Sequence, residues 1–290
     1  MDYFSKYPVL RLALITCLGL GLVGGGIVGL LIHLKPKEVI DMSVDEAKEE
    51  SFEYRAPNLD VPNPPQDLPY DEFEDFRQRE ILKANGISLS EAELIVALEQ
   101  ETGVLQAATA HTLGRLSSRG AIEPLKKLLT SSDDLVQVEA AYALARLGVP
   151  EGKEGLIRCL GYRLDAYICP AIAAGYLAQL GDPQGFQIIV KSFEVDIPAV
   201  RMLACKQLYF FVPFHGAKDK GGNPIDIFRV FERALKDADT NIQWQALVQL
   251  RQIRSAETKN ILEIYIEQTG DEQLRDVARE IVENNRSFGR

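Results

Sequence analysis

The residues able to do chemistry are few and scattered in this sequence. It has four cysteines, Cys17, Cys159, Cys169 and Cys205, and only three histidines. No CxxC pair occurs and no spacing matches a zinc or haem site, so the three cysteines after residue 37 are predicted to be small core residues on helices. No phosphate loop, GxSxG or HExxH motif is present either. The sequence therefore predicts a protein without a metal, a cofactor or an enzymatic activity, with scattered catalytic residues as the alternative.

One group of reactive side chains lies together in residues 212–224, VPFHGAKDKGGNP. His215 stands there close to Asp219 and two lysines, in a stretch whose glycines and prolines predict a loop. A long loop inside a regular helical array is often functional, and we expect binding rather than chemistry from this one. The alternative is a solvated loop, which the apolar residues 209–214 would attach to the array.

The charge of the chain separates its N-terminus from the rest. The 290 residues carry a net charge of -10 and are 46% hydrophobic, a composition typical of a globular protein. Residues 1–37 contain four bases and one acid, which leaves a net charge of -13 for the remainder. So acidic a body, without a basic stripe, repels phosphates, and nucleic acid is excluded as an expected partner.

A long uncharged run, LALITCLGLGLVGGGIVGLLIHL, predicts a transmembrane helix at residues 12–34, after a short tail at residues 1–11. About twenty residues at 1.5 Å each cross a hydrocarbon core of roughly 30 Å. A cleaved signal peptide is disfavoured because the run is too long and lacks an A-x-A-like exit. Gly19, Gly21 and Gly24 match the dinucleotide-binding fingerprint in letters only, since no strand precedes them. The segment is interpreted as an uncleaved, single-pass anchor.

Small residues recur every four positions in this segment and would form one ridge on a helix. Such a ridge lets two transmembrane helices approach closely, so it predicts a helix–helix contact and a possible homodimer. The alternative is that glycine is simply common in membrane helices. Basic residues on both sides leave the orientation nearly undecided, and an extracytoplasmic body is favoured over a cytoplasmic one. The ridge consists of Ala13, Cys17, Gly21, Gly25 and Gly29.

An acidic, proline-rich stretch at residues 35–69 predicts a disordered tether. Residues 38–85 contain 14 acids and five bases, so they bury little apolar surface and stay extended. The tether would separate the body from the membrane, with a docking peptide as the less favoured alternative. A helix is expected at residues 70–86, stopped by Asn85 and Gly86, where it would cap the open end of the following domain.

Internal repetition decides the fold class of residues 87–290. The clearest copy is VQVEAAYALARLG at residues 136–148, and equivalents of its Leu144 follow at intervals of 31, 33, 31, 42 and 31 residues. Small residues three and four positions before each equivalent allow close packing, and partner helices with the same period lie between them. The pattern predicts an all-α solenoid of about six helical pairs, with 212–224 as an insertion. The equivalent positions are Leu113, Leu144, Leu177, Leu208, Leu250 and Ile281.

The motifs VQVEAAYALARLG, AIAAGYLAQLGD at residues 171–182 and AIEPLKKLL at residues 121–129 resemble bacterial HEAT repeats. More narrowly, they are similar to the short HEAT-like repeats first named for phycobilisome lyases, over about residues 88–284. The resemblance implies the solenoid fold and identifies no lyase site. Repeats of this family often carry arginine just after the first valine of the second helix. Here that place holds Gln106, Gln137, Pro170, Arg201 and Gln243.

The side of each second helix opposite the core is predicted two residues before, two after, and five and six before the leucine position, at about 100° per residue. Apolar and aromatic side chains at such places indicate an interface for an amphipathic helix or an extended peptide. Contacts between neighbouring helices would explain them equally well. The predicted partner-binding face comprises Arg115, Tyr142, Arg146, Ile172, Met202, Leu203, Phe210, Trp244 and Val248, and His111 and Glu139 share these positions.

Anchor, tether and repeats in this order predict a membrane-anchored scaffold or adaptor that holds a protein partner on the inner face of its solenoid. Two alternatives stay open. The resemblance implies a phycobilisome-lyase-like enzyme or chaperone acting on a chromophore-bearing protein. The third possibility is a structural subunit of a membrane complex, in which the repeats serve as a spacer.

Overall fold

The fold is known from a computed structural model, which describes residues 57–65, 68–69, 72–161 and 168–286. Within these residues the chain forms thirteen α-helices and no strand, which confirms the all-α prediction. The predicted transmembrane helix at 12–34, its small-residue ridge and most of the tether lie outside the described residues. Among the helices that are described, none is long and apolar enough to span a bilayer.

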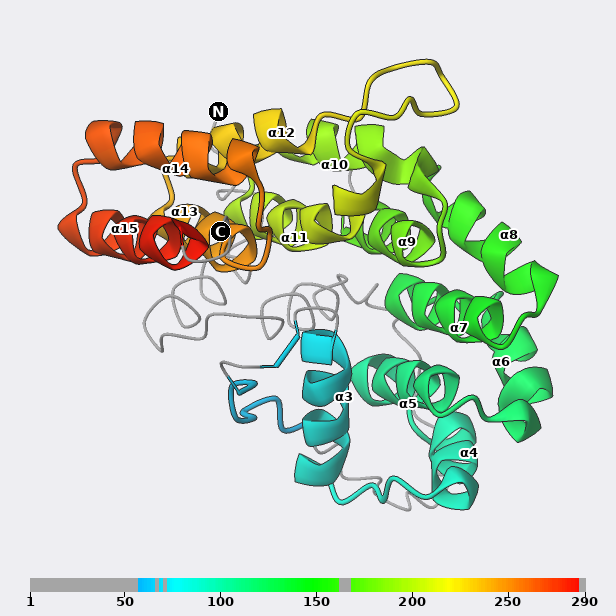
Figure 1. Ribbon diagram of the computed structural model, residues 1–290. Coiled ribbons are helices and arrows are strands. Elements are labelled where there is room, and N and C mark those ends of the chain that lie inside the picture. The colour runs from blue at the N-terminus through cyan, green and yellow to red at the C-terminus, as the bar shows by residue number, and fades with distance from the viewer. Residues whose placement is uncertain (1–56, 66–67, 70–71, 162–167, 287–290) are drawn as a thin grey trace, which may run out of the picture.

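Twelve of the helices form six consecutive antiparallel pairs, as the repeat period predicts. The second helix of each pair lines the inside of a C-shaped stack and the first helix covers the outside (Figure 1). The pairs are α4 (Glu91–Gln100) with α5 (Gly103–Arg115), α6 (Ile122–Leu128) with α7 (Asp134–Arg146), α8 (Pro150–Cys159) with α9 (Ile168–Gln179), α10 (Phe186–Ser192) with α11 (Pro198–Leu208), α12 (Ile227–Leu235) with α13 (Thr240–Leu250), and α14 (Ala256–Gln268) with α15 (Glu272–Arg286).

The repeated leucine positions form the core of the array. All six are at most 1% exposed, and the alanines and cysteine three residues before them are fully buried. The inner helices approach so closely that a methyl group built on Gly114 of α5 would lie 2.6 Å from Ala143 Cα of α7. Small residues at these places therefore set the spacing of the array, since apolar burial requires the helices to meet.

The first three inner helices end in the same way. The carbonyl groups of Leu113, Leu144 and Leu177 each accept a hydrogen bond from the backbone N–H five residues later, at 3.1, 2.9 and 2.8 Å. This closure needs a left-handed residue just after the helix, and Gly148 and Gly181 supply it with φ of 77° and 82°. In the first repeat a serine, Ser117, takes this conformation, with φ of 56°.

Replacing Ser117 with glycine is expected to raise the free energy of unfolding by about 0.5–1 kcal/mol, because glycine adopts a left-handed conformation without the steric cost of a Cβ atom. The reciprocal change, Gly148→Ser, places a Cβ atom in the same conformation and is expected to lower the free energy of unfolding by a similar amount. Urea denaturation of both variants checks the pair. Equal stability of Ser117→Gly and the parent protein would show that Ser117 is not strained.

Glutamine at the family's arginine position performs a common task in the turn between paired helices. Gln137 Nε2 donates to the Ser131 carbonyl at 3.0 Å, and Gln243 Nε2 donates to the Asp237 carbonyl at 2.7 Å. Arg201 Nη1 makes the equivalent bond to the Val195 carbonyl at 3.0 Å. All three bonds satisfy a carbonyl group six residues earlier, so glutamine replaces arginine without loss of this connection.

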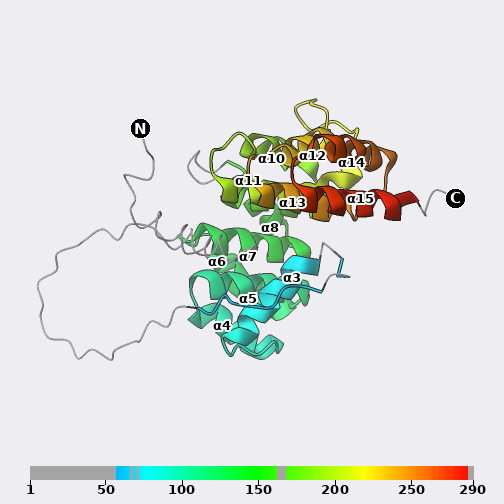
Figure 2. The same cartoon turned by 90° about the vertical axis from the view of Figure 1, so that its left-hand side faces the viewer.

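One helix, α3 (Phe73–Ala84), precedes the six pairs and packs against α5 (Figures 1 and 2). Ile81 and Leu82 in its last turn are buried. Asp75 in its first turn pairs with Arg79 at 2.9 Å and lies 3.7 Å from Arg115 Nε of α5. The sequence predicts a cap for the open end of the array, whereas α3 also reaches the inner layer, because its acidic first turn faces the basic side chain of α5.

The described end of the predicted tether is attached to the array. Asn85 accepts a hydrogen bond from the Asn58 N–H at 2.7 Å and donates one to the Asn58 carbonyl at 2.8 Å. Leu59 packs against both parts of the apolar core and Val61 against one of them. Residues 57–61 therefore differ from the disordered spacer that the proline and acid content predicts, because two apolar side chains find contacts on the helices.

The inserted loop is also attached to the array. Phe211, in the short 3-10 helix η5 (Tyr209–Phe214), is buried with its ring 5.4 Å from that of Phe186. Asp219 accepts a hydrogen bond from Gln187 of α10 at 3.0 Å and from the Asn223 N–H at 2.8 Å. His215 lies edge-on to Phe228, with ring centroids 4.8 Å apart. The side chains that suggest a reactive group in the sequence thus have structural contacts in the folded loop.

The three described cysteines are buried and free. Burial raises the pKa of the Cys159 thiol to about 11 and raises the pKa of the Cys169 and Cys205 thiols further. A folded protein that holds thiol protons more tightly than its unfolded chain loses stability once the unfolded thiols ionise. This stability is complete below the ordinary thiol pKa near 9 and is lost as the pH rises through the folded-state pKa.

We accordingly expect the free energy of unfolding to fall steeply above pH 9. As the pH rises from the unfolded-state pKa of a thiol to its folded-state pKa, each buried thiol lowers the free energy of unfolding by about 1.4 kcal/mol per pH unit. In Cys205→Ala the slope should be smaller than in the parent protein by about that amount. Urea unfolding between pH 8.5 and 10.5 measures the slope, and identical slopes would contradict the assignment.

Candidate functional site

Four buried side chains from three consecutive inner helices meet on the inner face. They are His111 of α5, Glu139 and Tyr142 of α7, and Tyr176 of α9, with exposed fractions of 2%, 3%, 1% and 4%. We refer to them as the inner-face cluster. Glu139 and Tyr142 share one side of α7 because residues three apart on a helix are neighbours. The close approach of Gly114 to Ala143 brings α5 to the same point.

Hydrogen bonds connect the members of the inner-face cluster. Tyr176 donates its hydroxyl hydrogen to Glu139 Oε1 at 2.6 Å, and His111 Nδ1 lies 3.0 Å from Glu139 Oε2. Tyr142 stacks on Tyr176 with ring centroids 3.8 Å apart and donates to Gln179 Oε1 at 2.9 Å. The carboxylate of one repeat is therefore held by side chains of the repeats on both sides.

Burial keeps the two tyrosines protonated. Burial raises the pKa of Tyr176, and the negative charge of Glu139 raises it further. Burial also raises the pKa of Tyr142, whereas the positive charges of Arg146 and Arg115 oppose that shift. Both hydroxyl groups thus serve as hydrogen-bond donors.

This arrangement is suited to holding three repeats in register rather than to proton transfer. Both carboxylate oxygens of Glu139 are engaged by neighbours, and a general base needs access to the proton it removes. His111 Nε2 is buried and has no hydrogen-bond partner within the described part of the chain. In that same part no three His, Cys, Asp or Glu side chains are grouped so as to hold a metal ion.

Two arginines, Arg115 and Arg146, lie at the edge of the inner-face cluster. Arg146 is exposed, and its guanidinium carbon lies 5.8 Å from the centre of the Tyr142 ring. Arg115 is half-buried beside Asp75 of α3. Among residues 57–65, 68–69, 72–161 and 168–286, no carboxylate forms a salt bridge with Arg146, and its guanidinium group contacts the Tyr142 ring instead.

The nine residues of the predicted partner-binding face do not form one exposed surface. Tyr142 belongs to the inner-face cluster, Arg146 lies over its ring, and Arg115 occupies the equivalent position one repeat earlier. Ile172 and Leu203 are in the core with Tyr142, because the inner helices also contact their neighbours in the stack. Met202, Phe210 and Val248 are half-buried, and Trp244 of α13 is 43% exposed. The small residues predicted to form a transmembrane contact, from Ala13 to Gly29, lie outside the described residues.

Sequence reasoning missed Tyr176, although the residue that it stacks on was recognised. Tyr142 stands two positions before its repeated leucine and Tyr176 stands one position before its own. A rule based on identical positions in every repeat cannot place the second tyrosine opposite the first. Their occurrence in the two most similar motifs, AAYALARLG and AAGYLAQLG, is the signal that points to a contact between them.

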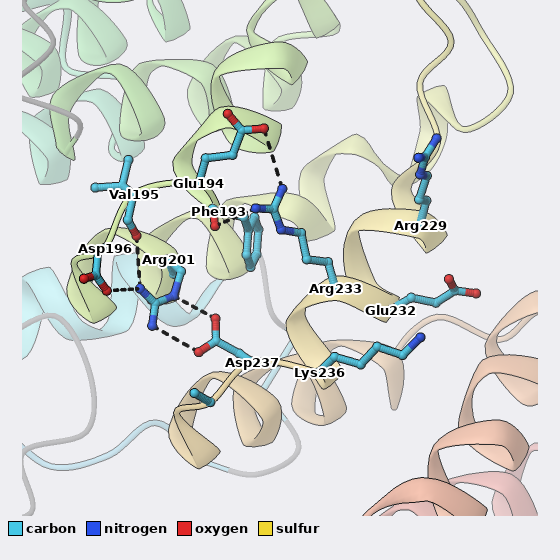
Figure 3. Close-up of a pocket in the computed structure, with 11 residues that line it drawn as sticks. Phe193, Glu194, Val195, Asp196, Arg201, Arg229, Glu232, Arg233, Lys236 and Asp237 are labelled. Atoms are coloured by element: carbon cyan, nitrogen blue, oxygen red, sulfur yellow. Dashed lines mark hydrogen bonds and ion pairs between the residues drawn. The ribbon is translucent and has the colours of Figure 1, made fainter.

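A polar cleft of about 590 Å³ lies between the turn after α10, the start of α11 and the helix α12 (Figure 3). Arg201 spans it to Asp237 with two hydrogen bonds of 2.7 and 3.1 Å, and Arg233 donates to the Phe193 carbonyl at 2.9 Å. The lining contains equal numbers of bases and acids, so it indicates no charge for a ligand. The charged residues are Arg201, Arg229, Arg233, Lys236, Glu194, Asp196, Glu232 and Asp237.

Comparison with known proteins supports the repeat assignment for part of the chain. Residues 91–168 match the family of HEAT repeats. No curated protein matches the sequence. An engineered protein of known crystal structure is 21% identical at a TM-score of 0.40, over 67% of this chain and 96% of that one. The complex of CpcE and CpcF of phycocyanin lyase from Nostoc sp. PCC7120 is 18% identical at a TM-score of 0.39, over 84% and 100% of the chains. Likenesses of this strength transfer neither a partner nor an activity to the protein.

Proposed function

We propose that this protein is a non-enzymatic scaffold or adaptor that binds another protein on the inner face of its helical array. The observation that supports it most is Trp244, which is 43% exposed on the inner helix α13, where tryptophan is a frequent anchor of protein contacts. Val248 lies one turn further along the same helix and is half-buried. Stacked helical repeats provide an extended concave surface of the kind that a partner helix or peptide can occupy.

The inner face offers two kinds of contact. Trp244 and Val248 supply apolar area on α13, whereas Arg115 and Arg146 supply positive charge on α5 and α7. The inner-face cluster connects α5, α7 and α9 by hydrogen bonds, so the helices that carry the two arginines are held in fixed relative positions. Rigid, pre-positioned side chains lose little freedom on binding, which favours affinity.

Affinity capture from gently solubilised membranes tests this function. Trp244→Asp is expected to lose a specifically captured protein, since a carboxylate cannot replace the buried contact of an anchoring tryptophan. Ile264→Asp is the matched control, because Ile264 is 40% exposed on the outer helix α14 and should be neutral. Recovery of the same proteins with both variants would contradict binding through the inner face.

We further propose that residues 12–34 anchor the protein in a membrane, with the body on the extracytoplasmic side and the ridge from Ala13 to Gly29 in a homodimeric contact. The support is the length and polarity of this run in the sequence. The full chain should resist alkaline extraction from membranes, whereas a chain beginning after residue 37 should be released. Release of both would refute the anchor, and protease protection of the body in intact vesicles reports the orientation.

The lyase-type alternative has a distinct expected result in the same capture. Its captured partner would carry a chromophore, and deletion of the protein would leave that partner unmodified. Recovery of a chromophore-free partner, unchanged by the deletion, favours the scaffold.

A further inference from the structure

Helix α3 carries acids where the inner face carries bases. Its N-cap residue is Glu72 and its first turn contains Glu74 and Asp75, of which Asp75 faces Arg115 of α5. The helix lies beside α5 in both views of the molecule (Figures 1 and 2). This is an acidic helical segment already seated on part of the proposed binding surface.

The two ends of α3 are held unequally. Ile81 and Leu82 of the last turn are in the apolar core, at 3% and 0% exposure. Asp75 of the first turn is also buried, yet its Oδ1 has no hydrogen-bond partner among the described residues and lies 3.7 Å from Arg115 Nε. A buried carboxylate oxygen without a hydrogen bond is costly, so the first turn is the part of α3 that a better ligand can replace.

The first turn also stands close to the inner-face cluster. Asp75 of that turn lies 3.7 Å from Arg115 Nε, and Arg115 follows His111 of the cluster by one turn of α5. Burial raises the pKa of the Tyr142 hydroxyl group, and the positive charges of Arg146 and Arg115 lower it. The acidic turn of α3 therefore lies beside Arg115, and Arg146 occupies the equivalent position on the next inner helix.

We propose that the inner face recognises an acidic helical segment of a partner protein, with Arg115 and Arg146 binding its carboxylates. In the free protein the first turn of α3 occupies Arg115, and the partner displaces it. Arginine forms two parallel hydrogen bonds to a carboxylate, which the 3.7 Å contact with Asp75 does not achieve. The proposal rests on the proposed function and adds the chemistry of the partner and the segment that competes with it.

Two variants separate a binding role of Arg115 from a structural one. Asp75→Ala and Arg115→Ala both remove the contact between α3 and α5, and Asp75→Ala also removes the ion pair with Arg79. Both should accelerate hydrogen exchange of the amides from Arg77 to Glu80, which are the first to donate within the helix. Only Asp75→Ala leaves the guanidinium free for a ligand. If Arg115 merely holds α3 in place, the two variants will bind the acidic peptide described below equally.

The probe is a fluorescent 16-residue alanine-based helical peptide with glutamates in its first turn, and its twin carries glutamines instead. Binding to the full chain in detergent is followed by anisotropy at low salt. Asp75→Ala is expected to bind the glutamate peptide about tenfold more tightly than the parent protein, which corresponds to 1.4 kcal/mol. Arg115→Ala should bind it no better than the glutamine peptide. Arg146→Ala should weaken binding several-fold without changing the exchange of α3.

Equal affinity of the glutamate and glutamine peptides would overturn the proposal, and so would equal affinity of Asp75→Ala and Arg115→Ala. Arg146→Ala keeps the α3 ion pair, so its helicity and melting temperature are expected to match those of the parent protein. This variant then reports binding alone. A failed capture from membranes alongside successful peptide binding would reject the proposed scaffold but keep this recognition. Successful capture from membranes alongside failed peptide binding would keep the proposed scaffold but reject this recognition.

Discussion

Replacing Glu139 with alanine is expected to lower the free energy of unfolding by about 2–4 kcal/mol, because two buried polar groups lose their hydrogen-bond partner. The change leaves the Tyr176 hydroxyl and His111 Nδ1 without the oxygens that they contact at 2.6 and 3.0 Å. These groups are buried, and leaving a buried polar group without a hydrogen-bond partner costs free energy. Urea denaturation followed by circular dichroism measures the loss.

Glu139→Gln is the matched control and is expected to cost only about 1 kcal/mol. Its amide oxygen still accepts from Tyr176, and its amide group donates to His111 Nδ1 if the imidazole carries its proton on Nε2. A double-mutant cycle with His111→Ala should show a coupling of at least about 1 kcal/mol between the two residues. A loss below 1 kcal/mol for Glu139→Ala would contradict the role of the cluster in joining the repeats.

Replacing Gly152 with alanine is expected to lower the free energy of unfolding by about 3 kcal/mol through overpacking. A methyl group at this position of α8 would lie 2.2 Å from the Ala145 backbone nitrogen and 2.6 Å from the Ala141 carbonyl oxygen. Both contacts are with the backbone of α7, so no side-chain rotation relieves them. The two helices would have to move apart, which opens the core around Leu144 and Leu156.

Gly161→Ala is the control for this prediction. Among the described residues, a methyl group there meets only the Arg158 carbonyl oxygen at 3.5 Å, an ordinary contact, and the stability should change by less than about 0.5 kcal/mol. Thermal melting of the two variants under identical conditions provides the comparison. A small effect of Gly152→Ala would mean that α7 and α8 are less closely packed than the structure has them.

The fold could be predicted because every repeat places the same side chains in the same environment. The six leucine positions are buried throughout, and small residues precede them wherever two inner helices meet. Glutamine at Gln137 and Gln243 looks like a departure from the family pattern. The structure shows that these glutamines make the same kind of contact as arginine, because their amide groups donate to the carbonyl six residues earlier, as Arg201 does.

The inner-face cluster could be predicted only in part. The helical angle that predicts solvent exposure for Tyr142 ignores the neighbouring repeat, and that repeat buries it against Tyr176. The place of α3 was also inaccessible to pattern reasoning. Its contact with Arg115 joins residues 40 positions apart in the sequence, and the packing of α3 on α5 brings them together. The repeated pattern thus predicts the helical array, whereas the inner-face cluster depends on the positions at which one repeat differs from the next.

Site-specific photo-crosslinking tests most directly whether the inner face binds a protein partner. A photoreactive amino acid is placed at Trp244 on α13 in one protein and at Ile264 on α14 in another, and both are irradiated in native membranes. The account predicts a discrete protein adduct from position 244 and none from position 264. Adducts from position 264 alone, or the same adducts from both positions, would contradict binding on the inner face.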